Sequence, residues 1–279
     1  LVQNGPNPRW VRPGSGHHLF EGDGMLHSTE LAAPRGAGGS RTVRYSNRWV
    51  RTAKWLAEDA VQMPLACGLV DTNVARIAFN AALDAASVAM AVPTILADPR
   101  LGEAGSFGGT ANTSVVAHGG RVLALQEGSQ PIAVTLPDLK TEGALASAAS
   151  FTAHPKVCPV TGELMWFNYK PGGLEYGVWD RDGRPVHQTT IPLPRFVLVH
   201  DMAVTEHYTV VLDCPLLMSP DSILSGDGPV RLDKEVPMRF GVLPRHGRGD
   251  EVQWYSVPGP GKMCFHVMNA YEDPCGELV

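Results

Sequence analysis

A long succession of short apolar segments, separated by turn sequences, is the feature that most constrains the fold. Between residues 113 and 212 these segments recur roughly every 10 residues, with turns such as His118-Gly119-Gly120 and Asp182-Gly183-Arg184 between them. This spacing predicts an all-β sandwich, barrel or propeller. The expected strands are Thr113–His118, Arg121–Gln126, Ile132–Leu136, Leu164–Tyr169, Tyr176–Asp180, Pro185–Ile191, Phe196–His200 and Tyr208–Leu212.

The first hundred residues add further strands and one helical segment. Residues 1–50 are rich in glycine and proline, and Arg41–Arg51 alternates polar with apolar side chains, which predicts a half-buried strand. Residues 52–97 are instead dominated by Ala, Leu and Met, which favour helix. We interpret 52–97 as a helical insert packed on the β core, or else as an apolar surface for a membrane or a lipophilic substrate.

The length bounds the domain organisation. At 40–50 residues a blade, 279 residues correspond to about four or five propeller blades. The chain starts at Leu1, without methionine, and ends with Gly276-Glu277-Leu278-Val279, which resembles the start of another strand. We therefore expect a single domain over residues 1–279 that is truncated at both ends.

Composition excludes several classes of protein. The net charge is −5 and no Lys/Arg cluster is interleaved with aromatic residues, which argues against nucleic-acid binding. The five cysteines are odd in number and lack Cys-x-x-Cys spacing, so neither a disulfide scaffold nor a zinc ribbon is expected. Without a signal peptide or a stretch of about 18 apolar residues, the prediction is a cytoplasmic protein, with peripheral membrane contact as an alternative.

Three of the ten histidines have strand-like surroundings. His200 ends the apolar run Phe196–Val199, and His154 and His266 also follow apolar or aromatic residues. The intervals between the three are 46 and 66 residues, close to one blade or one blade plus a loop. Equivalent inner strands of a propeller would bring them together at its axis, whereas in other folds they are more simply core histidines. Imidazole suits iron, copper and zinc alike.

The other histidines and one acid have plainer interpretations. Those next to glycine, charged or turn residues are expected to be solvated: His118, His187, His207 and His246. Those around the turn at residues 21–24 are expected to form structural hydrogen bonds: His17, His18 and His27. Glu127 ends a strand before Gly128; it is either a turn acid or the acceptor for the second ring nitrogen of a metal-bound histidine.

Nine blocks of sequence, in order, resemble the carotenoid cleavage oxygenase family, the non-haem iron dioxygenases that cleave carotenoids, apocarotenoids and stilbenes and that include the retinoid isomerase of the visual cycle. The blocks are Asn4–Pro8, His18–His27, Tyr45–Thr52, Ala111–Ser114, Leu123–Gly128, Thr152–Lys156, Val199–Asp201 with Asp213–Pro215, Arg239–Val242 and His266–Glu272.

The resemblance implies a seven-bladed β-propeller with a helical dome, of which this chain would form only part. It implies iron(II) on the axis, held by four histidines, the first three being His154, His200 and His266. Glu127 would be the carboxylate that orients His200. The fourth histidine and two later glutamates belong to a part of the family pattern that is absent from this chain, so the fragment alone is expected to be inactive.

The resemblance also implies that dioxygen, the co-substrate, adds across a conjugated C=C bond of a lipophilic polyene and yields two carbonyl products. Stilbene cleavers carry lysine immediately before the orienting glutamate, where this chain has Gln126, so a carotenoid or apocarotenoid is the expected substrate. A lignostilbene-type dioxygenase and a non-catalytic propeller that binds lipids or a protein partner remain as alternatives.

Overall fold

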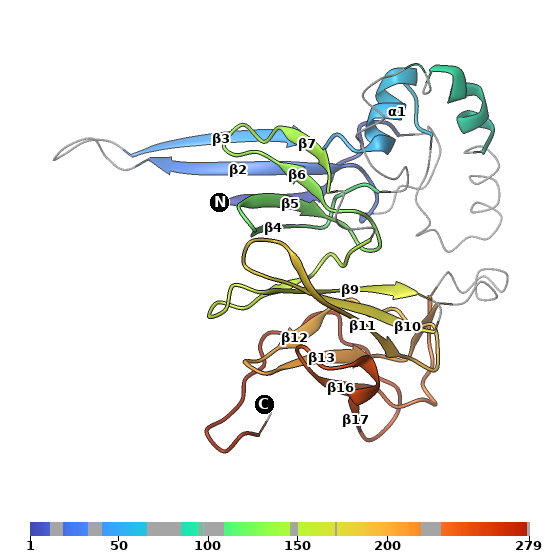
Figure 1. Ribbon diagram of the computed structural model, residues 1–279. Helices are drawn as coiled ribbons and strands as arrows, with labels where there is room; N and C mark the ends of the chain where they lie inside the picture. The colour runs from blue at the N-terminus through green and yellow to red at the C-terminus, as the bar shows by residue number, and fades with distance from the viewer. Residues whose placement is uncertain are drawn as a thin grey trace. The chain divides into compact units, whose positions relative to one another are not determined.

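The structure is a computed structural model that describes residues 1–11, 19–32, 41–65, 85–94, 97, 109–145, 150–170, 172–218 and 230–277. It contains two compact units (Figure 1). The first comprises the described residues up to Ala117 and from Arg121 to Ser150. The second comprises His118–Gly120 and the described residues from Phe151 onward. Each unit is described by itself.

The first unit begins with a three-stranded antiparallel sheet in the order β1-β2-β3. Its strands are β1 (Val2–Pro6), β2 (Gly24–Ala32) and β3 (Thr42–Trp49). The alternating segment Arg41–Arg51 therefore forms the predicted strand, but the expectation that it is half-buried is wrong. Val43 and Tyr45 are 65% and 57% exposed, because β1 pairs only with the first part of β2 and leaves the rest of the hairpin without a third strand.

A second sheet of this unit contains β4 (Ser114–His118), β5 (Arg121–Leu125), β6 (Ile132–Val134) and β7 (Thr141–Ala144), in that order. Asn4 ties the two sheets together, since its Nδ2 donates to the carbonyl oxygens of Ala111 at 2.7 Å and Ser114 at 2.9 Å. The chains approach so closely that a Cβ on Gly24 would lie 2.2 Å from the Ala111 oxygen. Only glycine fits at that position.

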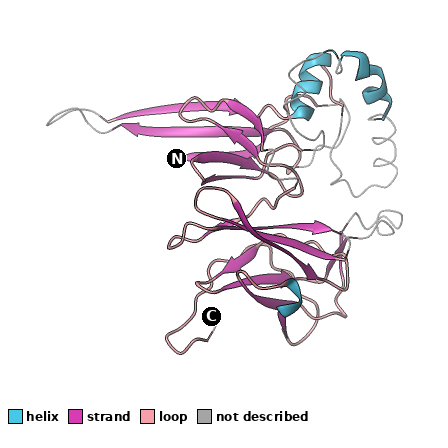
Figure 2. Cartoon of the chain, viewed as in Figure 1, coloured by secondary structure: helices cyan, strands magenta, loops and turns pink. Residues whose placement is uncertain are grey.

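Part of the segment 52–97, which was expected to be helical, forms helix where it is described, and residues 62–65 do not. Helix α1 (Ala53–Val61) begins at Thr52, whose side chain accepts a hydrogen bond from the Trp55 amide, and ends at Gln62. Residues 85–94 are also helical (Figure 2). Much of the predicted 52–97 insert lies outside the described residues. No helix in the described part of the chain is long and apolar enough to cross a membrane.

The second unit contains two four-stranded antiparallel sheets, in the orders β11-β10-β9-β8 and β12-β13-β16-β17. A two-stranded sheet, β14-β15, lies between β13 and β16 in sequence. The strands are β8 (Lys156–Val157), β9 (Leu164–Lys170), β10 (Gly173–Trp179), β11 (Pro185–Pro192), β12 (Met202–Val204), β13 (Tyr208–Asp213), β14 (Leu216–Met218), β15 (Val230–Leu232), β16 (Arg239–Pro244) and β17 (Gln253–Ser256). A short 3₁₀ helix, η2 (Gly249–Glu251), precedes β17.

One hydrophobic core joins these two sheets. Phe167 and Leu174 of the first sheet and Val211 of the second belong to the same buried cluster. The Tyr176 hydroxyl forms a buried hydrogen bond of 2.8 Å with Thr209 Oγ1, which satisfies both polar groups inside the core. The two sheets therefore pack on each other through one shared core, which also anchors the connections between their strands.

The predicted strand Phe196–His200 is wrong as a strand. Only Val197 forms a β-bridge, with Leu217, and two backbone hydrogen bonds to β14 flank it. Val197 and Val199 are both 1% exposed, so burial rather than sheet pairing explains the apolar run. The seven other expected strands overlap β4, β5, β6, β9, β10, β11 and β13.

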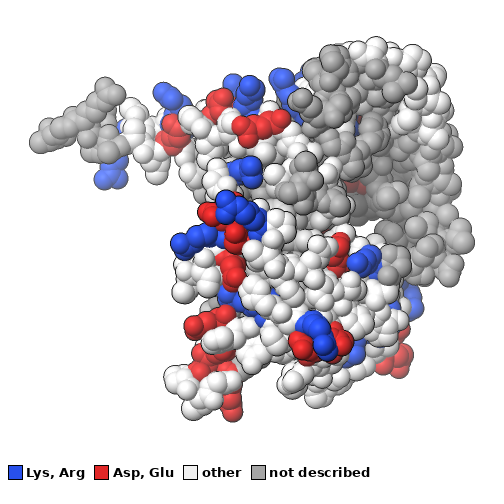
Figure 3. Space-filling model, in the orientation of Figure 1, with Lys and Arg blue, Asp and Glu red and all other residues white. Residues whose placement is uncertain are grey.

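Charged side chains of both signs are interspersed over the face in Figure 3. Described ion pairs on the surface include Arg184 with Asp182 at 3.0 Å and Arg248 with Asp250 at 3.0 Å. Exposed pairs of this kind contribute little to stability. Other ion pairs bury one partner: Arg239 pairs with Asp213, whose carboxylate is 1% exposed.

Candidate metal centre

His154, His200 and His266 lie together in the second unit. One potential ligand atom from each lies within 4.8 Å of those of the other two. The ring centroids are 4.6 Å apart for His154 and His200 and 4.8 Å for each pair that includes His266. Among the described residues this is the one group of three or more His, Cys, Asp or Glu side chains that could hold a metal ion.

Two of the three histidines occupy equivalent places in the two sheets. His154 precedes β8 by two residues, and His200 precedes β12 by two residues. Both β8 and β12 are the terminal strands of their sheets. The sheet-to-sheet repeat of the fold thus places the two imidazoles side by side.

None of the three histidines lies within a strand, contrary to the strand-like settings expected for them. His154 and His200 lie in the extended connections just before strands, and His266 belongs to the segment after β17, residues 257–277, in which Glu272 is assigned an isolated bridge but no strand forms. The side chain of His266 is 61% exposed. Contacts made by the residues next to His266 in sequence therefore determine where its imidazole lies.

Aromatic and hydroxyl side chains fix the segment that carries His154. Phe151 is fully buried and stacks on Trp166, with ring centroids 5.2 Å apart and an interplanar angle of 21°. Trp179 contacts the same ring at 5.0 Å. Thr152 Oγ1 accepts a hydrogen bond of 3.1 Å from the His154 amide. The backbone that leads to the first histidine is thus held by the core of its own sheet.

The cluster fits a transition-metal ion by the chemistry of its donors. Three imidazoles offer neutral nitrogen donors, the ligand type that iron, copper and zinc accept in proteins. The Phe265 ring meets the His200 ring edge to face at 5.1 Å and places an apolar group beside the cluster. An apolar neighbour of this kind limits the access of water to a metal site.

Asp201, directly after His200, is a buried acid beside the cluster, 2% exposed. Its Oδ2 lies 3.7 Å from His266 Nδ1, which is too long for a hydrogen bond. Burial acts to raise the pKa of Asp201, but the hydrogen bond from Lys156, together with backbone amides, outweighs burial and lowers the pKa below its usual value. Sequence reasoning assigned no role to Asp201 or Lys156.

Glu127 belongs to the first unit, where it is half-buried in the turn that follows β5. Its contact with His200, which the resemblance implies, stays a prediction. The adjacent Gln126 is engaged locally, because its Oε1 accepts hydrogen bonds from the Thr110 amide at 2.7 Å and from Ser129 Oγ at 3.3 Å.

The remaining histidines lie outside the cluster. The expectation that His118 is solvated is wrong: it is 8% exposed, and its Nε2 lies 3.0 Å from the Gly162 oxygen. His187 is half-buried and contacts the Gly247 oxygen, whereas His207 and His246 are exposed and pair with glutamates. His27 pairs with the Tyr45 hydroxyl, in agreement with the structural hydrogen bond expected for it. His17 and His18 lie outside the described residues.

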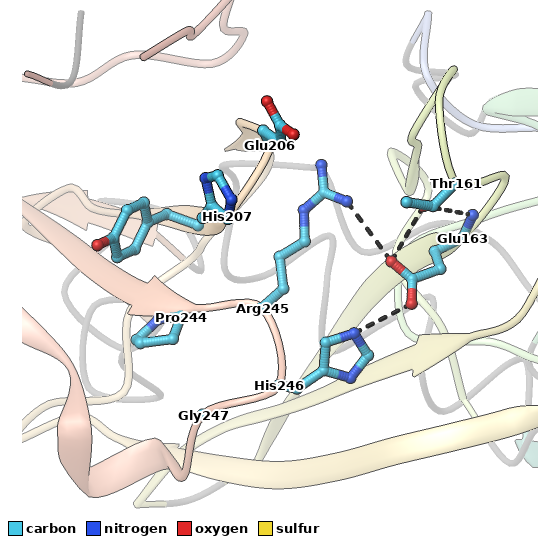
Figure 4. Close-up of a pocket in the computed structure, with 9 residues that line it drawn as sticks. Thr161, Glu163, Glu206, His207, Pro244, Arg245, His246 and Gly247 are labelled. Carbon is cyan, nitrogen blue, oxygen red and sulfur yellow. Dashed lines mark hydrogen bonds and ion pairs between the residues drawn. The ribbon is translucent and has the colours of Figure 1, made fainter. Parts of the chain in front are cut away.

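A pocket of about 610 Å³ lies at the other ends of β8 and β12 (Figure 4). It is lined by the turns that follow β8, β12 and β16. Glu163 accepts from both Arg245, at 3.5 Å, and His246, at 3.0 Å. In Figure 4 both carboxylate oxygens of Glu163 are thus already engaged by basic side chains of the pocket.

Glu272, beside this pocket, links the segment of His266 to the turn after β12. Its Oε1 accepts from Thr205 Oγ1 at 2.5 Å and from the His207 amide at 2.9 Å, and Oε2 lies 2.8 Å from His207 Nδ1. The hydrogen bond from Thr205, with those from His207, lowers the pKa of Glu272 to about 2. The same contact with Glu272 raises the pKa of His207.

The opposite shifts predict a stability window in pH. The depressed pKa of Glu272 contributes stability that is present above its unfolded value, 4.5, and is lost as the pH falls toward 2. The raised pKa of His207 contributes stability that is present below its unfolded value, 6.5, and is lost as the pH rises through the folded value. Thermal melting from pH 3 to pH 8 should show both losses. In Glu272→Gln both should be reduced; an unchanged pH profile in this variant would contradict the assignment.

Comparison with known proteins identifies the family. The family model described as retinal pigment epithelial membrane protein matches residues 1–279. A carotenoid 9,10(9',10')-cleavage dioxygenase of Crocus sativus is 32% identical over 285 aligned residues, which cover 98% of this chain and 48% of that protein. A 9-cis-epoxycarotenoid dioxygenase of Oryza sativa subsp. japonica is 36% identical over 293 aligned residues, which cover 99% and 43%. The chain spans about half the length of the curated relatives it matches.

Solved structures agree on the fold. A lignostilbene dioxygenase of Pseudomonas brassicacearum superposes with a TM-score of 0.70 at 29% identity, covering 92% of this chain and 49% of that one. A variant of Synechocystis apocarotenoid oxygenase superposes with a TM-score of 0.71 at 24% identity, covering 98% and 55%, a likeness of fold alone. The expected all-β fold, part of a propeller of the carotenoid oxygenase type, is confirmed. The chain belongs to the retinal pigment epithelial membrane protein family, which is the family of the carotenoid cleavage dioxygenases.

Proposed function

We propose that the protein to which this chain belongs is an iron(II)-dependent dioxygenase that cleaves a conjugated C=C bond of a carotenoid or apocarotenoid into two carbonyl products. The observation that carries the proposal is the meeting of His154, His200 and His266 in a chain of this family. These three histidines would hold iron(II), with Glu127 as the carboxylate that orients His200. A fourth histidine from outside these 279 residues would complete the site.

The roles of the chain's own residues follow from their chemistry. When bound, iron(II) supplies the electrons that allow dioxygen to react with an alkene. Imidazole binds metal ions as a neutral ligand, so the three histidines would leave the charge of the ion undiminished. The buried Phe151 and Thr152 hold the backbone before the first of them. The polyene has no acidic proton to remove, so no side-chain base is required. The protein contributes binding, orientation and the exclusion of water.

Two observations favour a carotenoid-like substrate. Relatives named as carotenoid or epoxycarotenoid dioxygenases are 32% and 36% identical. Gln126 is a neutral amide, so it offers no cation to a phenolate, and its oxygen already accepts two hydrogen bonds. The stilbene alternative is supported by the solved lignostilbene dioxygenase at 29% identity.

The test is a substrate panel on the complete protein, loaded anaerobically with iron(II) and then exposed to dioxygen. We expect aldehyde or ketone products from carotenoids or apocarotenoids, and less or none from stilbenes. Cleavage of stilbenes alone would favour the alternative, and iron binding without product from either class would refute the dioxygenase. A propeller that only binds lipids or a partner would instead bind no iron and would tolerate substitution of His200. For these 279 residues alone we expect little or no turnover.

A further inference from the structure

Asp201 makes a set of contacts that converges on the three histidine segments. Its carboxylate is buried between His200 and β12. Oδ1 accepts a hydrogen bond of 2.8 Å from the Met202 amide and lies 2.7 Å from Lys156 Nζ. Oδ2 accepts a hydrogen bond of 3.0 Å from the Val267 amide. All three partners are donors, and both carboxylate oxygens are used.

Each contact reaches a different histidine segment. Lys156 follows His154 by two residues, Asp201 follows His200 directly, and Val267 follows His266 directly. One carboxylate thus bridges three stretches of chain that lie 46 and 66 residues apart in sequence. The contact with the segment of His154 is made by the Lys156 side chain, and those with the segments of His200 and His266 are made by backbone amides.

The segment of His266 depends most on this bridge. It contains no strand, and the His266 side chain itself is exposed. The Val267 side chain packs against the buried cluster of Leu212, Cys214 and Met238, while the Val267 amide is bound to Asp201. These two contacts fix the residue adjacent to the histidine, and the hydrogen bond gives its backbone a direction that apolar packing alone does not supply.

We infer that Asp201 is a positioning residue for the metal centre, which holds the segments of His154, His200 and His266 in the arrangement that binds the ion. The inference rests on the proposed function, because it presupposes that the three histidines are ligands. Partners that orient ligands are worth about 10- to 100-fold in metal affinity. Asp201 would act through the three histidine segments that it joins.

Asp201→Asn is the informative variant. The amide keeps the size of the side chain, but it must place its NH₂ either toward Lys156 and the Met202 amide or toward the Val267 amide. All of these groups are donors, so at least one contact becomes donor against donor. The variant therefore loosens one histidine segment from the others without opening a cavity.

Asp23→Asn is a matched control from the first unit. Asp23 is also buried, at 1% exposed, and its carboxylate pairs with Lys54 at 3.1 Å and accepts from the Arg9 amide at 3.0 Å. Its substitution disrupts a buried Asp–Lys pair of the same kind with no histidine segment attached. Loss of stability alone would therefore affect both variants.

The experiment titrates this chain and both variants with Co(II), a spectroscopic probe of the imidazole site, and follows its visible absorption; circular dichroism verifies folding. We expect Asp201→Asn to bind Co(II) about 10- to 100-fold more weakly with an altered spectrum, and Asp23→Asn to match the unaltered chain. Equal affinity and spectrum in Asp201→Asn would overturn the inference alone. Absence of Co(II) binding by the unaltered chain would refute the metal centre and the inference together.

Lys156→Met is the substitute test variant if Asp201→Asn does not fold. It removes one contact of the bridge and leaves both backbone hydrogen bonds to Asp201 in place. A folded Lys156→Met chain with weaker Co(II) binding and a changed spectrum would support the inference. Unchanged binding in that variant would overturn it.

Discussion

Replacing His200 with alanine is expected to lower the affinity of the three-histidine cluster for Co(II) or iron(II) by more than about 100-fold, beyond the range for residues that only orient ligands. The reason is geometric, because His200 lies within contact distance of both other rings, at 4.6 Å and 4.8 Å between centroids. Its loss leaves two imidazoles of the described cluster. Titration followed by the visible absorption of Co(II) measures the change, and metal analysis after anaerobic iron loading checks it.

His246→Ala is the control for that variant. His246 is another histidine of the second unit, with a side chain that is 50% exposed and bound to Glu163 rather than to the cluster. Its removal should leave metal affinity unchanged within about twofold. If His200→Ala bound metal as tightly as His246→Ala, the three histidines would not be the metal site.

Phe151→Ala is expected to lower the free energy of unfolding of the second unit by about 3–5 kcal/mol, the usual cost of a buried phenylalanine. Phe151 is fully buried and packs against both Trp166 and Trp179. Urea denaturation followed by tryptophan fluorescence reports the change, because both contacting rings are indoles. The cavity also removes the support of the segment that leads to His154, so metal affinity should fall as well.

Phe20→Ala provides the comparison for an exposed ring. Phe20 is 70% exposed and belongs to the first unit. Its substitution should change stability by no more than about 0.5 kcal/mol. Similar destabilisation by both variants would show that the aromatic stack around Phe151 does not anchor the sheet.

The strands that could be predicted from sequence are mainly those long enough to show an apolar pattern within their own residues. β9, β10, β11 and β13 have six to eight residues each and lie between clear turns. β8 and β12 have two and three residues and were not predicted, whereas β6, also of three residues, lies inside the expected strand Ile132–Leu136. β8 and β12 are strands only because a neighbouring strand supplies their hydrogen bonds, which is information from tertiary structure.

Predictions for individual residues were wrong for the same reason, because burial depends on tertiary contacts. The run around His266 is apolar in sequence, yet Phe265 is 45% exposed and Met268 fully exposed, so apolar character did not indicate a buried strand. His118 lies beside two glycines and is nevertheless buried, because its ring packs near Trp179, 61 residues away in sequence. The convergence of the three histidines was expected only on the assumption of a propeller. The two sheets place His154 and His200, whereas His266 is placed by contacts of the strandless segment that carries it.

The sequence contained an indication of the contacts of Asp201 that the prediction did not use. Lys156, Asp201 and Val267 each lie within two residues of a predicted ligand, inside blocks shared with the family. Lys156 and Asp201 are oppositely charged and lie close to ligands in two separate blocks, which indicates a contact between them. Their pairing could not be read from spacing, because it requires knowing which ends of β8 and β12 meet.

We expect the segment of residues 257–277 to control how fast a metal ion enters and leaves the site. His154 and His200 precede strands of packed sheets, whereas His266 is attached through a few contacts on either side of it, to Cys214, Asp201 and Thr205. Segments with few such contacts open at a lower free energy than the sheets beneath them. A bound ion could therefore leave by local detachment of this segment while both sheets stay folded, and hydrogen exchange at the Val267 amide would report how often the detachment occurs.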